Sequence, residues 1–225
     1  MEIMSWKYTD EYYKNYTRET WDECAEKYIP LSRQLVPFHR MPKDMLPATL
    51  AVIAAERQGH EKGHRLYRAL LRRNIVGDQD VTQEATIFGA VKEAGLDDTR
   101  FKSDWADQAS LKTDLEKQGE GSPPVHVGFY NIAVTDSHGR TVYLDQKFQP
   151  SVVEEAIDYL SSGQLKKTRP ADVHAYLQAH GPTSLVEVER VFNLSSKDAL
   201  AELERLEKLG KAKRLTLTGA NFWSS

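Results

Sequence analysis

The sequence has a single cysteine, Cys24, in 225 residues. A chain with one thiol forms no internal disulfide, no thiolate zinc cluster and no two-cysteine redox pair. It also lacks any run of about 18 consecutive apolar residues, the length at which a membrane-spanning helix is expected. Its first residues, MEIMSWKYTDEYYKNY, contain no basic region followed by an apolar one, so a secretory signal is not expected. These absences predict a cytoplasmic protein with no membrane partner.

The chain has no strong excess of charge of either sign. Lys and Arg number 30, Asp and Glu number 33, and the formal net charge is −3. A balance so near neutrality argues against a partner recognised mainly through charge, such as nucleic acid. The length and composition fit one large domain with a small appendage. The sequence predicts no cofactor and no bound metal.

From Thr17 to about Leu115, nearly every segment has a pattern typical of a helix. PATLAVIAAERQG and the following HEKGHRLYRALLRRN predict two helices, with Gly59 and Gly63 weakening the junction between them. Asp80 is the expected N-cap of the next helix, with Gln83 completing a capping box and Gly95 marking the end. One or two short helices are expected to follow.

The pattern changes after residue 120. VHVGFYNIAV, the turn TDSHGR and TVYLDQ are typical of a β-hairpin with a glycine in its loop. PSVVEEAIDYLSSG then predicts a helix that begins at proline and ends at glycine. A hairpin and one helix do not form an independently stable sheet. We therefore expect them to complete a sheet or to pack on the helical region.

The last part of the chain, residues 170–225, follows a polar and basic linker at 163–169. Three helices and then a short hairpin are expected, which is the order of a winged helix-turn-helix. Ser184 with Glu187, and Ser195, are the expected caps of the second and third helices.

The third helix of this part, SSKDALAELERLEKLG, is too acidic for a DNA-reading helix, because its carboxylates would repel phosphate. Docking of another protein, or a homodimer, fits better. Phe222 and Trp223 are then expected to pack under the wing.

Three motifs resemble the DsbA-like branch of the thioredoxin superfamily, closest to its FrnE-type cytoplasmic members. They are PATLAVIAAERQG at 47–59, GLD at 95–97 and GSPPV at 121–125. The resemblance covers about residues 5–162. It implies an α+β, mainly α fold, with an incomplete thioredoxin-like sheet, a helical insertion at about 17–118 and the winged helix-turn-helix behind it. The expected domains are thus residues 1–162 and 170–225, joined by the linker 163–169.

The resemblance also implies a substrate-binding site at Ser122, Pro123 and Pro124. Pro123 would be the cis-proline of the fold, next to the active site and presenting a backbone edge to an extended protein substrate. A rigid loop leading into an edge strand explains the same two prolines.

The activity that the resemblance implies is thiol–disulfide exchange by a C-x-x-C pair. That pair would lie upstream of the matching region, and this sequence does not contain it. The chain is therefore expected to be a relative of disulfide oxidoreductases that is itself inactive in redox chemistry. The alternative is a non-catalytic protein-binding adaptor, or a transcriptional regulator, acting through the winged-helix-like tail.

Three further features have a functional and a plainer interpretation. HEKGH at 60–64 matches the zinc-protease pattern H-E-x-x-H, with Glu61 as the base, but its glycines favour a solvated helix start. Cys24 is expected in a helix core rather than as a reactive thiol. Arg65, Arg68 and Arg72 share one helical face, which either holds an acidic partner or is simply solvated.

Overall fold

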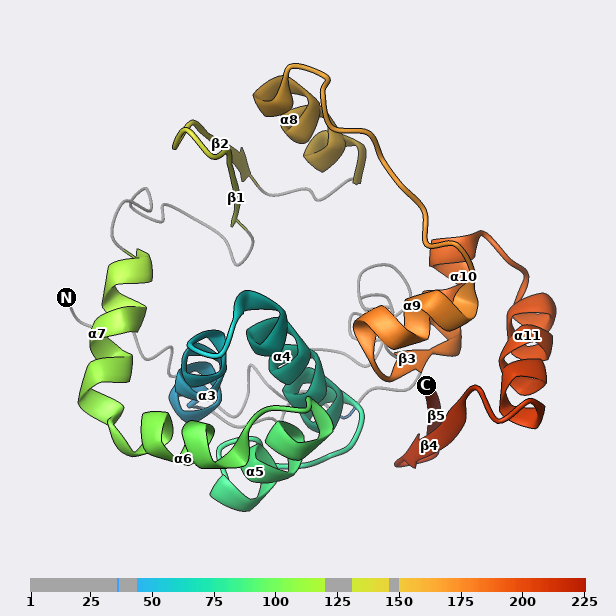
Figure 1. The fold of residues 1–225 in the computed structure, drawn as a ribbon, viewed down its shortest axis with the longest axis horizontal. Coiled ribbons are helices and arrows are strands. Elements are labelled where there is room, and N and C mark those ends of the chain that lie inside the picture. The colour runs from blue at the N-terminus through green and yellow to red at the C-terminus, as the bar shows by residue number, and fades with distance from the viewer. Residues whose placement is uncertain (1–35, 37–43, 120–130, 146–149) are drawn as a thin grey trace, which may run out of the picture. The chain divides into compact units, whose positions relative to one another are not determined.

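The computed structural model describes residues 36, 44–119, 131–145 and 150–225 (Figure 1). The chain divides into two compact units. One comprises Met1–Gln118 together with Pro170–Ser225, and the other Gly119–Arg169. Among the described residues, no helix is both long enough and apolar enough to cross a membrane.

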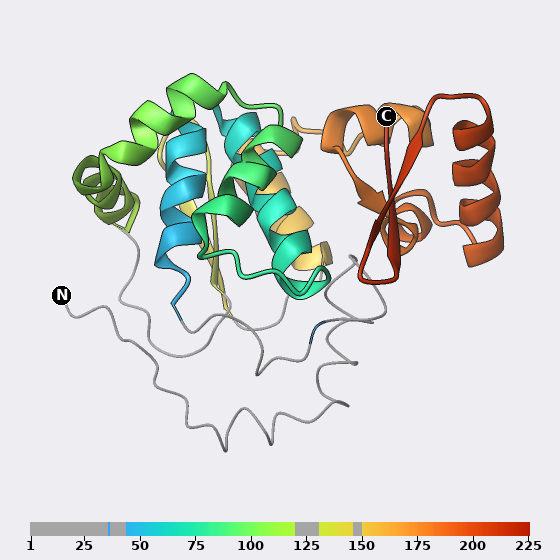
Figure 2. The same ribbon diagram turned by 90° about the horizontal axis from the view of Figure 1, so that it is seen from below.

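The first unit begins with two helices that pack side by side, α3 (Leu46–Glu56) and α4 (His60–Ile75), seen in Figures 1 and 2. The predicted junction is confirmed, because Gly59 lies between the two helices and has a φ of +124°, a conformation that favours glycine and interrupts the helix. Gly63 lies inside α4 instead. A Cβ atom at Gly63 would lie 2.3 Å from Cγ of Glu56, so this glycine marks a close approach of the two helices.

Three more helices complete the helical region: α5 (Glu84–Glu93), α6 (Asp98–Ala106) and α7 (Gln108–Gly119). The expected cap at Asp80 is wrong, since α5 begins after Gln83. The Asp80 carboxylate instead accepts hydrogen bonds from the Thr82 backbone N–H at 2.9 Å and from the Gln83 amide at 3.0 Å. These bonds close a turn ahead of the helix. Gly95, with a φ of +66°, follows the end of α5 as expected.

The core of the helical region is built from small and branched side chains of α3 to α7. Its largest fully buried members are Leu50, Leu66, Ile87, Phe101 and Leu111. At its edge the Gln58 side chain accepts from the Asp97 N–H at 2.9 Å and donates to the Asp97 carbonyl at 3.1 Å. The sequence motifs at 47–59 and 95–97 therefore meet through this pair of hydrogen bonds.

The second unit contains the expected hairpin and helix. Strands β1 (Asn131–Thr135) and β2 (Thr141–Asp145) pair antiparallel, with Val134 opposite Val142. Helix α8 (Pro150–Ser161) packs on the hairpin and buries Ala156 and Leu160.

Residues 170–225, called here the C-terminal module, contain three helices and a three-stranded sheet. Their elements are α9 (Val173–His180), β3 (Thr183–Ser184), α10 (Leu185–Phe192), α11 (Ser196–Lys208), β4 (Lys213–Leu217) and β5 (Ala220–Ser224). The sheet is antiparallel, in the order β3-β5-β4. The expected order of three helices and a hairpin is present, and the short strand β3 is an addition.

Both caps expected in the module are confirmed. Ser184 Oγ accepts from the Glu187 N–H at 3.1 Å, and Ser195 Oγ accepts from the Asp198 N–H at 3.2 Å. Trp223 packs in the core of the module as expected, whereas Phe222, on the other side of β5, packs with Ile75 and Val76 at the end of α4.

Candidate functional site

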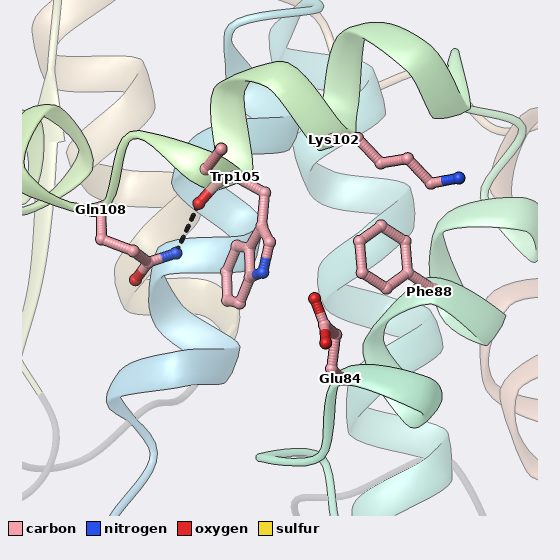
Figure 3. Close-up of a pocket in the computed structure, with 6 residues that line it drawn as sticks. Glu84, Phe88, Lys102, Trp105 and Gln108 are labelled. Atoms are coloured by element: carbon pink, nitrogen blue, oxygen red, sulfur yellow. Dashed lines mark hydrogen bonds between the residues drawn. The ribbon is translucent and has the colours of Figure 1, made fainter.

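An open hollow on the helical region gathers side chains from α5, α6 and α7 (Figure 3). Its volume is about 520 Å³, and it is lined by Glu84, Phe88, Lys102, Trp105, Ala106 and Gln108. A space of this size lies within the range of about 300–1,000 Å³ found for ligand sites. Because it is open rather than enclosed, it suits a side chain presented by another molecule.

Aromatic rings form the apolar part of the hollow. Phe101 is fully buried beneath it and stacks with Trp105, their ring centroids 6.0 Å apart and their planes 12° apart. Phe88 meets Phe101 edge to face at 5.7 Å. Phe88 and Trp105 are each only partly buried. The hollow therefore presents two aromatic surfaces on a rigid base.

The rim of the hollow is polar. The Lys102 ammonium lies 5.8 Å from the centre of the Phe88 ring, within reach of a cation–π interaction. The Gln108 amide donates to the Trp105 carbonyl at 2.7 Å. Glu84 lies on α5, across from the α6 residues in Figure 3. Within the described ranges, neither Lys102 nor Glu84 forms an ion pair, so both charges are available to a partner.

A second cluster joins α4 to the C-terminal module. Arg68 Nη2 lies 2.7 Å from Oε1 of Glu187, and the Tyr176 hydroxyl donates to the same oxygen at 2.8 Å. Glu187 is buried. Arg65 Nη2 adds a bond to the Ala179 carbonyl at 3.4 Å.

Arg72 lies at the centre of this junction and is 1% exposed. Its guanidinium donates to the Pro182 carbonyl at 3.1 Å and pairs with the Glu93 carboxylate, which Arg73 also contacts at 2.6 Å. The Phe222 ring centre lies 5.9 Å from Cζ of Arg72. Arg68 and Arg72 therefore hold acidic partners within the chain, and Arg65 bonds a backbone carbonyl, so the arginine stripe is not a solvated face.

At this junction the pKa values of Arg72, Tyr176 and His180 differ from their ordinary values. Burial lowers the pKa of Arg72, and Glu93 opposes that shift. Burial, with help from the Glu187 charge, raises the pKa of Tyr176 well above its ordinary value. Burial and the positive charge of Arg68 lower the pKa of His180, whose ring packs 4.3 Å from that of Tyr176.

The substrate-binding residues expected from the sequence, Ser122, Pro123 and Pro124, lie outside the described residues, as does Cys24. Those assignments stay predictions.

His60 and His64 both lie in the first two turns of α4, and the His60 side chain is 91% exposed. In the described part of the chain, no three His, Cys, Asp or Glu side chains gather closely enough to hold a metal ion. His60 is therefore a solvated side chain at the start of this helix.

The hollow was missed at the sequence level. The available signal was the aromatic pair Phe101 and Trp105, four residues apart on one helix, and hence on one face. Phe88 comes from another helix, and no local pattern joins it to them.

The chain is similar to known proteins in two comparisons. Residues 11–120 match the family model described as thioredoxin. The ClpXP adapter protein SpxH of Shouchella clausii is 26% identical over 182 residues, covering 78% of this chain and 59% of that protein. SpxH of Halalkalibacterium halodurans is 25% identical over 181 residues, covering 78% and 58%. SpxH of Staphylococcus aureus is 25% identical over 183 residues, covering 78% and 68%.

These matches show a thioredoxin-like region in the chain and homology to the SpxH proteins. They confirm the thioredoxin part of the resemblance seen in the sequence. The matching part of the chain spans less than two thirds of the length of the first two relatives. The relatives' printed name is that of an adaptor, which favours the second of the two functions left open by the sequence.

Proposed function

We propose that this protein is a non-catalytic adaptor that binds a client protein and brings it to the ClpXP protease. The observation that carries the proposal is the homology to ClpXP adapter proteins over 78% of the chain. An adaptor needs two binding surfaces and no reacting groups. The single cysteine of this sequence agrees with that requirement, because thiol–disulfide exchange by a dithiol needs two.

The arrangement of the first unit supports the proposal. The Arg68–Glu187 ion pair, the Arg72 hydrogen bond to the Pro182 carbonyl and the packing of Phe222 hold the C-terminal module against α4 within one compact unit. The aromatic hollow supplies one surface of the kind that binds proteins, since exposed aromatic anchors dominate such interfaces.

The C-terminal module is, in this proposal, a winged helix-turn-helix that docks protein rather than DNA. Its wing carries Arg214, but that guanidinium lies 2.8 Å from Glu207 of α11 and 5.2 Å from the Trp223 ring centre. A basic residue already engaged in this way contributes little to phosphate binding.

Several finer features belong to the same proposal. The adaptor is cytoplasmic. Residues 163–169 link its thioredoxin-like part, residues 1–162, to the C-terminal module, residues 170–225, which packs back on α4 of that part. The hairpin of the second unit is part of an incomplete thioredoxin-like sheet. The segment Ser122, Pro123 and Pro124 offers a backbone edge to an extended client.

A reconstituted degradation assay tests the adaptor. Proteins whose half-lives lengthen in cells lacking this protein are purified and incubated with ClpX, ClpP and ATP, with and without the chain. We expect faster degradation of at least one client when the chain is present. Equal rates with and without it for every such client would refute the proposal.

The alternative hypothesis, that the chain is a disulfide oxidoreductase, is tested separately. Insulin reduction by the purified chain, with dithiothreitol as the electron donor, should not exceed the rate without protein. Turnover that disappears in a Cys24→Ser variant would instead point to a redox enzyme.

A further inference from the structure

We infer that the hollow between α5, α6 and α7 binds one apolar side chain of a client segment, flanked on that segment by an acidic and a basic residue. The inference rests on the proposed adaptor function and specifies what the adaptor would recognise. The occupant is a short stretch of another protein, identified by this alternation of charge around an apolar anchor.

The apolar part of the inference follows from the two partly exposed rings. Phe88 and Trp105 are both supported from beneath by Phe101, which is fully buried. Aromatic residues held in one orientation lose little entropy on binding and are enriched among the residues that carry binding energy. An aliphatic or aromatic side chain inserted between them would remove both from water.

The hollow is formed in advance of binding. Arg57, at the end of α3, contacts Asp114 on α7 at 3.0 Å and Asp104 on α6 at 3.5 Å, so one guanidinium ties the two helices together. Its Nη2 also donates to Ser110 at 2.7 Å. At the α6–α7 corner, Gln108 holds the carbonyl of Trp105. Such preorganisation lowers the entropic cost of binding.

The charges of the rim specify the flanks. Lys102 on α6 and Glu84 on α5 are exposed and have no ion-pair partner in the described part of the chain. Figure 3 shows the two side chains on either side of the Phe88 ring. An acidic residue of the client beside Lys102 and a basic residue beside Glu84 would satisfy both, and like charges in those places would be repelled.

Three synthetic peptides of eleven residues test the inference, each with a central leucine in an otherwise Ser/Gly background. In the mixed peptide the leucine has a glutamate on one side and a lysine on the other. In the second peptide it lies between two glutamates, and in the third between two lysines. Binding is measured by fluorescence anisotropy and by the NMR shift of the Trp105 indole N–H, assigned with a Trp105→Phe variant.

We expect the mixed peptide to bind wild type best and to shift the Trp105 signal. Lys102→Glu should change the preference to the two-lysine peptide, and Glu84→Lys to the two-glutamate peptide. Lys112→Glu, an exposed site on α7 that does not line the hollow, is the matched control and should leave the order unchanged. Replacing the central leucine by alanine should weaken binding at least about tenfold.

Ala106→Arg tests the hollow without removing a core ring, because Ala106 is exposed and lines it. This variant should keep the wild-type melting temperature and lose peptide binding. The inference is wrong if no peptide binds wild type, if binding leaves the Trp105 signal unmoved, or if both charge variants keep the wild-type preference.

The two proposals fail separately. If Ala106→Arg still accelerates degradation by ClpXP as wild type does, the hollow is not the client site and the adaptor function stands. If wild type binds the mixed peptide through the hollow but never accelerates degradation, the adaptor function fails and the hollow remains a peptide site.

Discussion

The guanidinium of Arg68 donates to the buried carboxylate of Glu187 at 2.7 Å, although 119 positions separate the two residues in the sequence. Tyr176 donates to the same oxygen, so the carboxylate is held from α4 and from α9 at once. This bond and its neighbours place the C-terminal module in the same compact unit as the helical region. The module is thus part of the folded body of that unit.

Glu187→Ala should lower the free energy of unfolding by about 3 kcal/mol, because it leaves Arg68 partly buried without its partner. Urea unfolding followed by circular dichroism measures the loss. The matched control is Glu202→Ala on α11, whose ion pair with Arg205 is more exposed and should be worth less than about 1 kcal/mol. Equal effects of the two changes would show that the junction contributes no special stability.

Acidification should destabilise the first unit through His180. Its pKa is lowered in the folded protein, so below its ordinary value of 6.5 the unfolded chain binds more protons than the folded one. The stability supplied by neutral His180 is present above that value and is lost as the pH falls toward the folded pKa. The charges of Arg68, Glu187, Glu61 and Arg65 act on the pKa of His180. His64, whose own pKa is lowered, interacts electrostatically with His180 as well.

The measurement is the free energy of unfolding at pH 7.5 and at pH 5.5, for wild type and for His180→Gln. The decrease between the two pH values should be smaller in the variant. His138→Gln, in the exposed turn of the second unit, serves as the control and should retain the wild-type decrease. A decrease that is the same in all three proteins would contradict the assignment to His180.

Gly63→Ala should destabilise the protein by about 1–3 kcal/mol, since the new Cβ would overlap Cγ of Glu56. The sign should reverse when Glu56 is already alanine, because the clash is then absent. In that background the better helix propensity of alanine, up to about 1 kcal/mol, is gained. Thermal melts of the four proteins complete the cycle. A Gly63→Ala effect that does not depend on residue 56 would rule out the close approach.

Phe222→Ala should loosen the C-terminal module from α4 and cost about 3–5 kcal/mol, because the ring is fully buried against Ile75 and Val76. Limited proteolysis should then cut the module faster than in wild type. Leu209→Ala is the control, since that side chain is 56% exposed and its loss should change stability by less than about 0.5 kcal/mol. Unchanged proteolysis of the Phe222 variant would show that the ring does not hold the module.

The sequence predicted features that depend on neighbouring residues. Ser184 and Ser195 cap their helices as expected because a cap is formed within four residues. The predicted cap at Asp80 was wrong for an equally local reason, since the same carboxylate can close a turn instead of capping a helix. The partners of Arg68 and Arg72 were beyond prediction, because no periodicity links α4 to Glu187, Pro182 or Glu93.

The first unit is discontinuous in sequence: Gly119–Arg169 leaves it and Pro170–Ser225 returns to it. A single cut in the exposed segment 163–169 would therefore sever the chain without separating the module from α4. The two fragments should travel together through a sizing column and come apart only in detergent. If only the peptide chain held the module, it would separate from the rest of the protein as soon as the chain is cut. Co-elution of the two fragments would show that packing on α4 holds the module.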